Sequence, residues 1–187
     1  MGISFHMGDS RVVVAIPQAG IVLKFPRVHV RNLGRLFASE FKDRPFRVGL
    51  KKNLVSLFKY DVDTLWAPKR LPFKGFADNW REWRFSQELN HPVLARTYLF
   101  MGGVNVQAYA APLPFQVKET FEGVMEFVRR FVPILGNKIA RDGHHFENHE
   151  NFGVIDGHFV VVDYAGRKVQ SILREHADDL VRDFPLK

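Results

Sequence analysis

Apolar and polar residues alternate along the chain in a way that predicts several short β-hairpins. Three pairs of apolar, β-branched runs each flank a turn sequence, as the strands of a hairpin do. The pairs are 10–16 with 21–25, 94–100 with 104–110, and the two halves of 151–166 around Asp156-Gly157. An Asp-Gly pair is typical of a two-residue hairpin turn. A large part of the chain is therefore expected to form antiparallel sheet.

Helical spacing of apolar residues appears in three other segments. They are 78–89, with Asp78 as the expected N-cap, the amphipathic stretch 117–135, and 165–184 near the end of the chain. The sequence APLP at 111–114 predicts a rigid connector, because proline fixes its own backbone angle. Strands dominate the first part of the chain and helices the second, so the predicted fold class is α+β.

The composition is that of one ordinary folded domain. The chain has 187 residues, 46% of them hydrophobic, which allows a sizeable core. It has no cysteine, hence no disulfide and no thiolate chemistry, which suits a reducing cytoplasm. No apolar run approaches the roughly 20 residues of a membrane-spanning helix, and the first residues lack the pattern of a secretory leader. We therefore expect a cytoplasmic protein with no membrane partner.

Positive charge is concentrated in one block. The formal net charge is +7; residues 27–75 hold 12 Lys/Arg against 4 Asp/Glu, and the rest of the chain holds 15 against 16. Such a block is typical of a docking surface for nucleic acid or for an acidic macromolecule. A solvated face of a folded domain has the same composition, so both interpretations stay open.

Two hard oxygen ligands stand at the ends of the hairpin in 151–166. Asn151 precedes its first strand and Asp163 follows its second. A hairpin places its ends side by side, and Mg²⁺ takes one or two protein oxygens together with phosphate oxygens. The hairpin therefore predicts a magnesium site, although Asn and Asp are also common at strand ends for conformational reasons.

The order of these features resembles the protein-kinase-like fold, in particular the minimal, atypical kinase-like proteins of bacteria and phages. The residues that carry the resemblance are Gly8 and Ser10 in HMGDS, Lys24 in IVLKF, Glu82 in NWREW, Asn151 before FGVI, and Asp163 in DYAG. The resemblance implies one domain over 1–187, with two lobes. The N-lobe would span about 1–110 and carry the basic insert 27–75, followed by a hinge at 111–114 and a truncated C-lobe at 115–187.

The resemblance also implies a role for each of these residues. The expected nucleotide-binding residues are Gly8, Ser10, Lys24 and Ala111; the catalytic residues are Asp142, Lys24 and Glu82; the Mg²⁺ ligands are Asn151 and Asp163. Lys24 is expected to contact ATP phosphates while an ion pair with Glu82 holds it in place. Glu88 is the alternative partner for Lys24, and Asn148 is the alternative metal ligand.

The chain departs from the family pattern at the catalytic base. The family's base lies five residues before the metal-binding Asn, where this chain has Phe146, which cannot accept a proton. Asp142, four residues earlier, is the nearest candidate, and Glu147 is the alternative. Only 24 residues follow Asp163, too few for the helices that hold a peptide substrate in protein kinases.

We therefore expect a minimal kinase that uses ATP and Mg²⁺ to phosphorylate a Ser/Thr/Tyr hydroxyl of a macromolecular partner, as in a phage or bacterial effector acting in a host cytoplasm. The alternative is a non-catalytic pseudokinase that binds a host or acidic partner through the basic insert. A nucleic-acid binder unrelated to kinases is a third possibility. The histidines His144, His145 and His149 allow a zinc site, but no carboxylate-His helix motif frames them, so a polar loop is the favoured interpretation.

Overall fold

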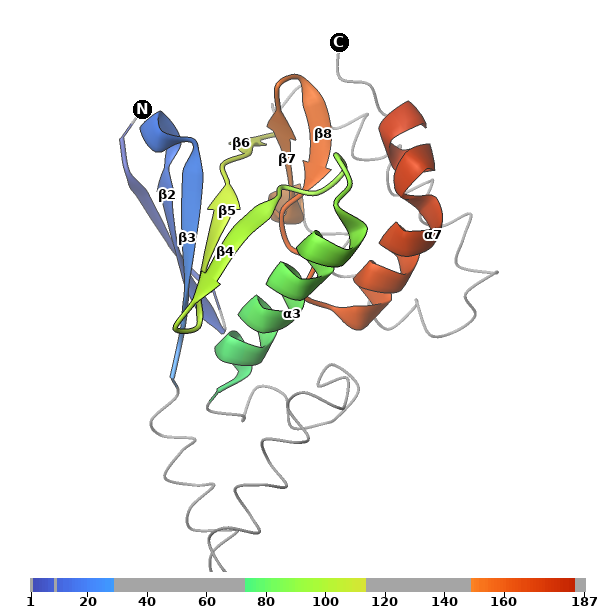
Figure 1. Ribbon diagram of the computed structural model, residues 1–187. Coiled ribbons are helices and arrows are strands. Elements are labelled where there is room, and N and C mark those ends of the chain that lie inside the picture. The colour runs from blue at the N-terminus through green and yellow to red at the C-terminus, as the bar shows by residue number, and fades with distance from the viewer. Residues whose placement is uncertain (1, 9, 29–72, 114–148, 184–187) are drawn as a thin grey trace, which may run out of the picture.

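The computed structural model describes residues 2–8, 10–28, 73–113 and 149–183, which contain two antiparallel sheets and two α-helices (Figure 1). The five-stranded sheet, of order β1-β2-β3-β5-β4, is built from β1 (Ser4–Met7), β2 (Arg11–Ile16), β3 (Ile21–Pro26), β4 (Thr97–Met101) and β5 (Val104–Ala108). The second sheet is built from β6 (Ala111–Pro112), β7 (Phe152–Ile155) and β8 (His158–Val161). The helices are α3 (Lys74–Leu89) and α7 (Arg167–Asp183), with single 3₁₀ turns at η1 (Pro17–Ala19) and η4 (His149–Asn151). The expected α+β class is confirmed.

All three predicted hairpins form, as β2–β3, β4–β5 and β7–β8. Asp156 and Gly157 have φ angles of 51° and 78°, the left-handed values that a type I′ hairpin turn requires at both central positions. In the first hairpin Arg11 lies opposite Pro26 and Val13 lies opposite Lys24. Because side chains alternate between the faces of a strand, this register puts Arg11 and Lys24 on the same face of the sheet.

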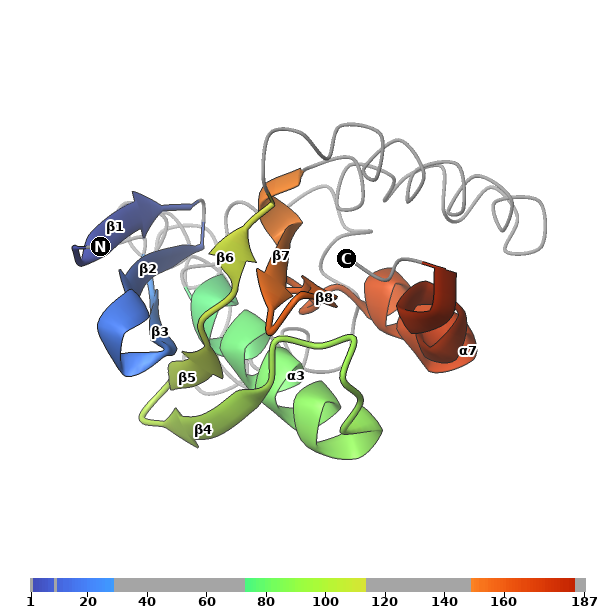
Figure 2. The same ribbon diagram turned by 90° about the horizontal axis from the view of Figure 1, so that it is seen from above.

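Helix α3 lies between the five-stranded sheet and α7 (Figures 1 and 2). The apolar core forms where α3, the β7–β8 hairpin and α7 meet. Its buried members include Phe85, Val93, Leu94, Phe152, Phe159, Val161, Tyr164, Ile172, Leu173 and Leu180. The interface between α3 and the five-stranded sheet contains buried polar and charged residues instead, among them Lys24, Asn79, Glu82 and Asn105.

The two sheets are joined through the segment that precedes β4. The amide of Val161 donates to the carbonyl of Val93 at 2.7 Å, and the amide of Ala95 donates to the carbonyl of Val161 at 3.0 Å. These bonds fix the end of β8 against the first sheet. Asp163, two residues beyond, is therefore brought to the edge of the interface between α3 and that sheet.

Three elements differ from the sequence-based predictions. Strand β1 was not expected, and Ala111–Pro112, expected to be a connector, pairs with β7 instead. Asp78 was wrongly predicted as a helix cap: α3 begins at Lys74, inside the range expected for the insert, and Asp78 lies one turn further along. The physical reason is a tertiary contact, because the Asp78 carboxylate accepts a hydrogen bond from the hydroxyl of Ser10 at 2.8 Å.

The helix expected at 117–135 and most of the basic insert lie outside the described residues. Neither α3 nor α7 combines the length and apolar character that crossing a bilayer demands.

Candidate functional site

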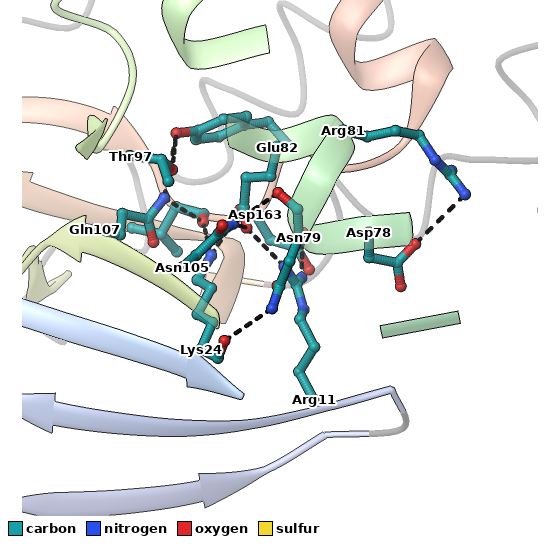
Figure 3. A network of polar contacts seen from close by, with 12 residues as sticks. Arg11, Lys24, Asp78, Asn79, Arg81, Glu82, Thr97, Asn105, Gln107 and Asp163 are labelled. Atoms are coloured by element: carbon teal, nitrogen blue, oxygen red, sulfur yellow. Dashed lines mark hydrogen bonds and ion pairs between the residues drawn. The ribbon is translucent and has the colours of Figure 1, made fainter. Parts of the chain in front are cut away.

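Four charged side chains from separate parts of the chain meet between α3 and the five-stranded sheet (Figure 3). They are Arg11 of β2, Lys24 of β3, Glu82 of α3 and Asp163, which follows β8. Asp163 is the most accessible, with 28% of its side chain exposed, whereas the other three side chains are exposed by 10% or less. Buried charges are costly unless they are paired, so the pairing within this cluster decides what the site can bind.

Lys24 and Glu82 form the ion pair that the sequence predicted. The Lys24 ammonium donates to Glu82 Oε1 at 2.6 Å and to the carbonyl of Val162 at 2.7 Å. The second bond directs Lys24 toward the residue that precedes Asp163. Glu88, the alternative partner, forms an exposed ion pair with Arg174 at 3.1 Å.

Arg11 was missed by the sequence analysis and connects the two carboxylates of the cluster. Its Nη1 donates to Glu82 Oε2 at 2.7 Å and its Nη2 donates to Asp163 Oδ1 at 2.8 Å. The signal that could have found it is the register of the first hairpin: Arg11 is two residues from Val13, which lies opposite Lys24. The period of two along a strand then places both cations toward α3.

The cluster contains two cations and two carboxylates, so its formal charges cancel. Burial lowers the pKa of Lys24 below its usual value, and the neighbouring Arg11 lowers it further, while Glu82 opposes both effects. Burial also disfavours the charge of Arg11, but Asp163 and Glu82 outweigh it and raise the pKa of Arg11 above its usual value. Arg11 is therefore a permanent positive charge in the site.

Two buried asparagines hold the backbone around the ion pair. The Asn79 amide donates to the carbonyls of Lys24 and Gly103 at 2.8 and 2.7 Å. The Asn105 amide donates to the carbonyl of Asn79 at 2.9 Å and lies 3.4 Å from Glu82 Oε2. Strands β3 and β5 are thereby locked to α3, so the geometry of the Lys24–Glu82 pair is rigidly determined.

Gly8 and Ser10, in the turn expected to bind phosphate, already form hydrogen bonds with other residues of the protein. The amide of Gly8 donates to the carbonyl of Arg11 at 2.9 Å, and the carbonyl of Gly8 accepts from Arg27 at 2.8 Å. The hydroxyl of Ser10 donates to Asp78. A phosphate that bound to the Gly8 amide or the Ser10 hydroxyl would have to replace these partners, because both donors already serve the fold.

The backbones that carry the two expected metal ligands lie close together, and the Asp163 side chain is already neutralised by Arg11. The amide of Val162 donates to the carbonyl of Asn151 at 2.8 Å, so the hairpin does set Asn151 beside the segment that bears Asp163. Within the described ranges no three His, Cys, Asp or Glu residues gather into a metal-binding group. The oxygen donors of Asn151 and Asp163 suit Mg²⁺ in company with phosphate oxygens. The charge balance does not suit a bare metal ion, because Arg11 already satisfies Asp163.

Ala111, the predicted hinge contact, is exposed in β6 opposite Val154 of β7. Several predicted residues lie outside the described part of the chain: Asp142, His144, His145, Phe146, Glu147 and Asn148. The third histidine, His149, begins η4.

Comparisons of the chain with protein-family models, with curated proteins and with solved structures gave no match.

Proposed function

We propose that this chain is a minimal kinase-like phosphotransferase that binds ATP together with Mg²⁺ at the cluster around Lys24. The single observation that carries the proposal is the buried Lys24–Glu82 ion pair, which reaches the carbonyl next to Asp163. Phosphoryl transfer needs a positioned cation for the nucleotide phosphates and oxygen ligands for a metal. Lys24, Asp163 and Asn151 supply these groups within one region of the fold.

The fold supports this function by positioning rather than by covalent chemistry. Glu82 orients Lys24, and Asn79 and Asn105 hold the strands and the helix that carry the pair. Mg²⁺, when bound with the nucleotide, neutralises negative charge on the phosphates. Phosphoryl transfer depends mainly on such positioning and electrostatic stabilisation, so a small chain with few reactive groups is sufficient.

Thermal unfolding with nucleotide tests the proposal. A ligand that binds only the native state stabilises it by about 2.7 kcal/mol at 100 times its Kd, so the Tm of the unmodified chain should rise with MgATP concentration. Lys24→Met and Asp163→Asn should remove that rise, whereas Glu88→Gln, at the exposed pair with Arg174, should retain it. Circular dichroism establishes that each variant is folded. Unmodified protein that shows no rise with saturating MgATP rejects the proposal.

The catalytic base is the second part of the proposal and is based on the sequence. Asp142 takes this role, with Glu147 as the alternative. General-base catalysis contributes about 10²–10⁴-fold, so Asp142→Asn should slow phosphate transfer by that order while MgATP binding persists. Transfer of radiolabelled phosphate to the chain itself or to a peptide library measures the rate. An Asp142→Asn variant with unchanged transfer moves the role to Glu147.

The second candidate function is a pseudokinase, and one specific observation favours it. Arg11 forms a salt bridge with Asp163, the residue that an active kinase uses for its metal. A protein that binds MgATP yet transfers phosphate to no acceptor fits this alternative. In either case the proposed macromolecular partner docks on the basic insert 27–75, whose excess of Lys and Arg over Asp and Glu favours an acidic surface.

A further inference from the structure

We propose that Arg11 is a built-in counter-ion that takes the place of a divalent cation at Asp163, so that the site admits a metal only together with the negative charge of a phosphate ligand. This inference rests on the proposed function for the nature of the ligand. Its test uses a metal ion alone, so it can fail while nucleotide binding is upheld, and the reverse.

The geometry of Arg11 is that of a bridging cation. One guanidinium nitrogen bonds to Glu82 at 2.7 Å and the other to Asp163 at 2.8 Å. Both distances are typical of strong, charge-assisted hydrogen bonds. Arginine does not lose its proton in proteins, so this positive charge is present at every pH at which the protein is folded. Arg11 therefore remains in its salt bridge with the Asp163 carboxylate until a competing cation displaces it.

The charges around Asp163 determine which cation can displace Arg11 from its carboxylate. Lys24 bonds to Oε1 of Glu82, and Arg11 bonds to Oε2, so both oxygens of Glu82 already face a cation. Because the cluster of two cations and two carboxylates is already neutral, a bare divalent ion at Asp163 would leave an excess of positive charge beside Arg11 and Lys24. A metal ion that binds together with phosphate oxygens has its positive charge offset by the negative charge of the phosphate. The released nitrogen of Arg11 then has an anionic acceptor, the phosphate.

Asp163 is the point at which this exchange takes place, because it is the accessible end of the cluster. Its side chain is 28% exposed, against 0% for Glu82. Arg11 can release Asp163 while its other nitrogen stays on Glu82. The exchange thus requires the planar guanidinium group to turn as a whole about its bond to Glu82.

A purely structural role for Arg11 makes a different prediction from the counter-ion role. If Arg11 only joins β2 to α3 and to the end of β8, removing it lowers stability and changes nothing else. If it is a counter-ion, removing its charge converts Asp163 into a metal-binding carboxylate. A gain of metal binding separates the two roles.

The experiment measures Mn²⁺ binding in the absence of nucleotide, by the electron paramagnetic resonance signal of free Mn²⁺. The unmodified chain is expected to bind weakly or not at all, and Arg11→Gln should bind one Mn²⁺ at least about tenfold more tightly, because a unit charge next to the ligand has been removed. Arg11→Lys keeps a positive charge but lacks the planar fork that bonds to both carboxylates, so it should bind Mn²⁺ less tightly than Arg11→Gln does. Adding Asp163→Asn to Arg11→Gln should abolish the gain. Arg174→Gln, which frees the exposed Glu88, is the matched control and should gain nothing.

Two results would overturn the inference: an unmodified chain that binds Mn²⁺ alone as tightly as Arg11→Gln does, or a folded Arg11→Gln variant with no gain. If Arg11→Gln does not fold, the unmodified chain decides by itself through its Tm. A Tm that rises with Mn²⁺ alone contradicts the inference, and a Tm that rises only when Mn²⁺ and ATP are added together supports it. A chain that responds to neither addition contradicts both the proposed function and this inference, because the site then admits no metal even together with a phosphate ligand.

Discussion

At the scale of single residues, the stability of the site depends on the balance of charge around Glu82. Its two oxygens accept from Lys24 at 2.6 Å and from Arg11 at 2.7 Å, and its side chain is fully buried. Breaking a buried pair by removing one partner leaves an uncompensated charge, which is more destabilising than losing both partners. The effect of removing one member of the Lys24–Glu82 pair therefore depends on whether the other member is present, and no single energy describes the pair.

We predict strong coupling between Lys24 and Glu82. Glu82→Gln leaves two cations facing only Asp163 and should lower the free energy of unfolding by about 3–5 kcal/mol. The double variant with Lys24→Met restores balance, because Arg11 and Asp163 still neutralise one another, and should lose about 0.5–3 kcal/mol less than the sum of the single changes. Urea unfolding measures all three.

The control for this cycle is Glu88→Gln at the exposed pair with Arg174, which should change stability by no more than about 0.5 kcal/mol. Additive losses in the double variant would mean that Lys24 and Glu82 do not act as a pair in solution.

At the scale of elements, α3 is placed by close contact of its first turn with the first hairpin. A Cβ atom built at Gly75 would lie 2.2 Å from the carbonyl oxygen of Ser10 and 2.9 Å from Cα of Pro26. Both neighbours are backbone atoms, which cannot rotate out of the way. Gly75 therefore allows the helix to approach the strands closely enough for Glu82 to reach Lys24, two turns further along.

Gly75→Ala is predicted to destabilise the fold although alanine favours helix by about 1 kcal/mol over glycine. Overpacking against backbone costs about 1–3 kcal/mol and should exceed that gain. Thermal unfolding should show a lower Tm, because α3 moves away from β3. Arg84→Ala, at an exposed position of the same helix, should leave the Tm nearly unchanged. A higher Tm for Gly75→Ala would show that the helix has room to shift.

At the scale of the whole molecule, the hydroxyl of Tyr164 joins the second sheet to the first through hydrogen bonds. It follows Asp163, is fully buried, and its hydroxyl donates to the carbonyl of Ala95 at 2.8 Å. The same hydroxyl lies 2.9 Å from Thr97 Oγ1, and Gln107 donates to it at 3.3 Å. Burial and the nearby charge of Glu82 raise the pKa of Tyr164 above the usual value for tyrosine.

This shift predicts how stability changes in alkaline solution. Unfolded tyrosine loses its proton near pH 10, whereas native Tyr164 retains it to a higher pH. The native state then binds more protons than the unfolded state, so the stability from Tyr164 is complete below pH 10 and declines above it by about 1.4 kcal/mol per pH unit. Urea unfolding at several pH values should show this decline for the unmodified chain relative to Tyr164→Phe. A constant difference between the two proteins from pH 8 to 11 would contradict the shift.

The sequence by itself determined the local elements and one long-range pair. The three hairpins and the terminal helix follow from periodicity and turn residues, because these signals lie within short segments. The pairing of Lys24 with Glu82 was implied by the resemblance to the protein-kinase-like fold, and the ion pair is present in the structure. Boundaries were less well predicted. Asp78 is of a residue type that commonly caps helices. Its carboxylate instead accepts a hydrogen bond from Ser10, 68 residues away, and no local signal encodes that contact.

Only the tertiary structure decided the electrostatics of the site. Arg11 and Asp163 are 152 residues apart in sequence, and they meet because two hydrogen bonds between Val161 and the segment before β4 set the β7–β8 hairpin against the first sheet. The position of a charged residue in a strand indicates on which face of the sheet its side chain lies. It does not indicate the residue with which the side chain pairs, since that partner depends on how whole elements pack. The sequence therefore predicted Lys24, Glu82 and Asp163 as members of the site but not Arg11, whereas the packing of α3 and two hairpins determined that an arginine already neutralises the expected metal ligand.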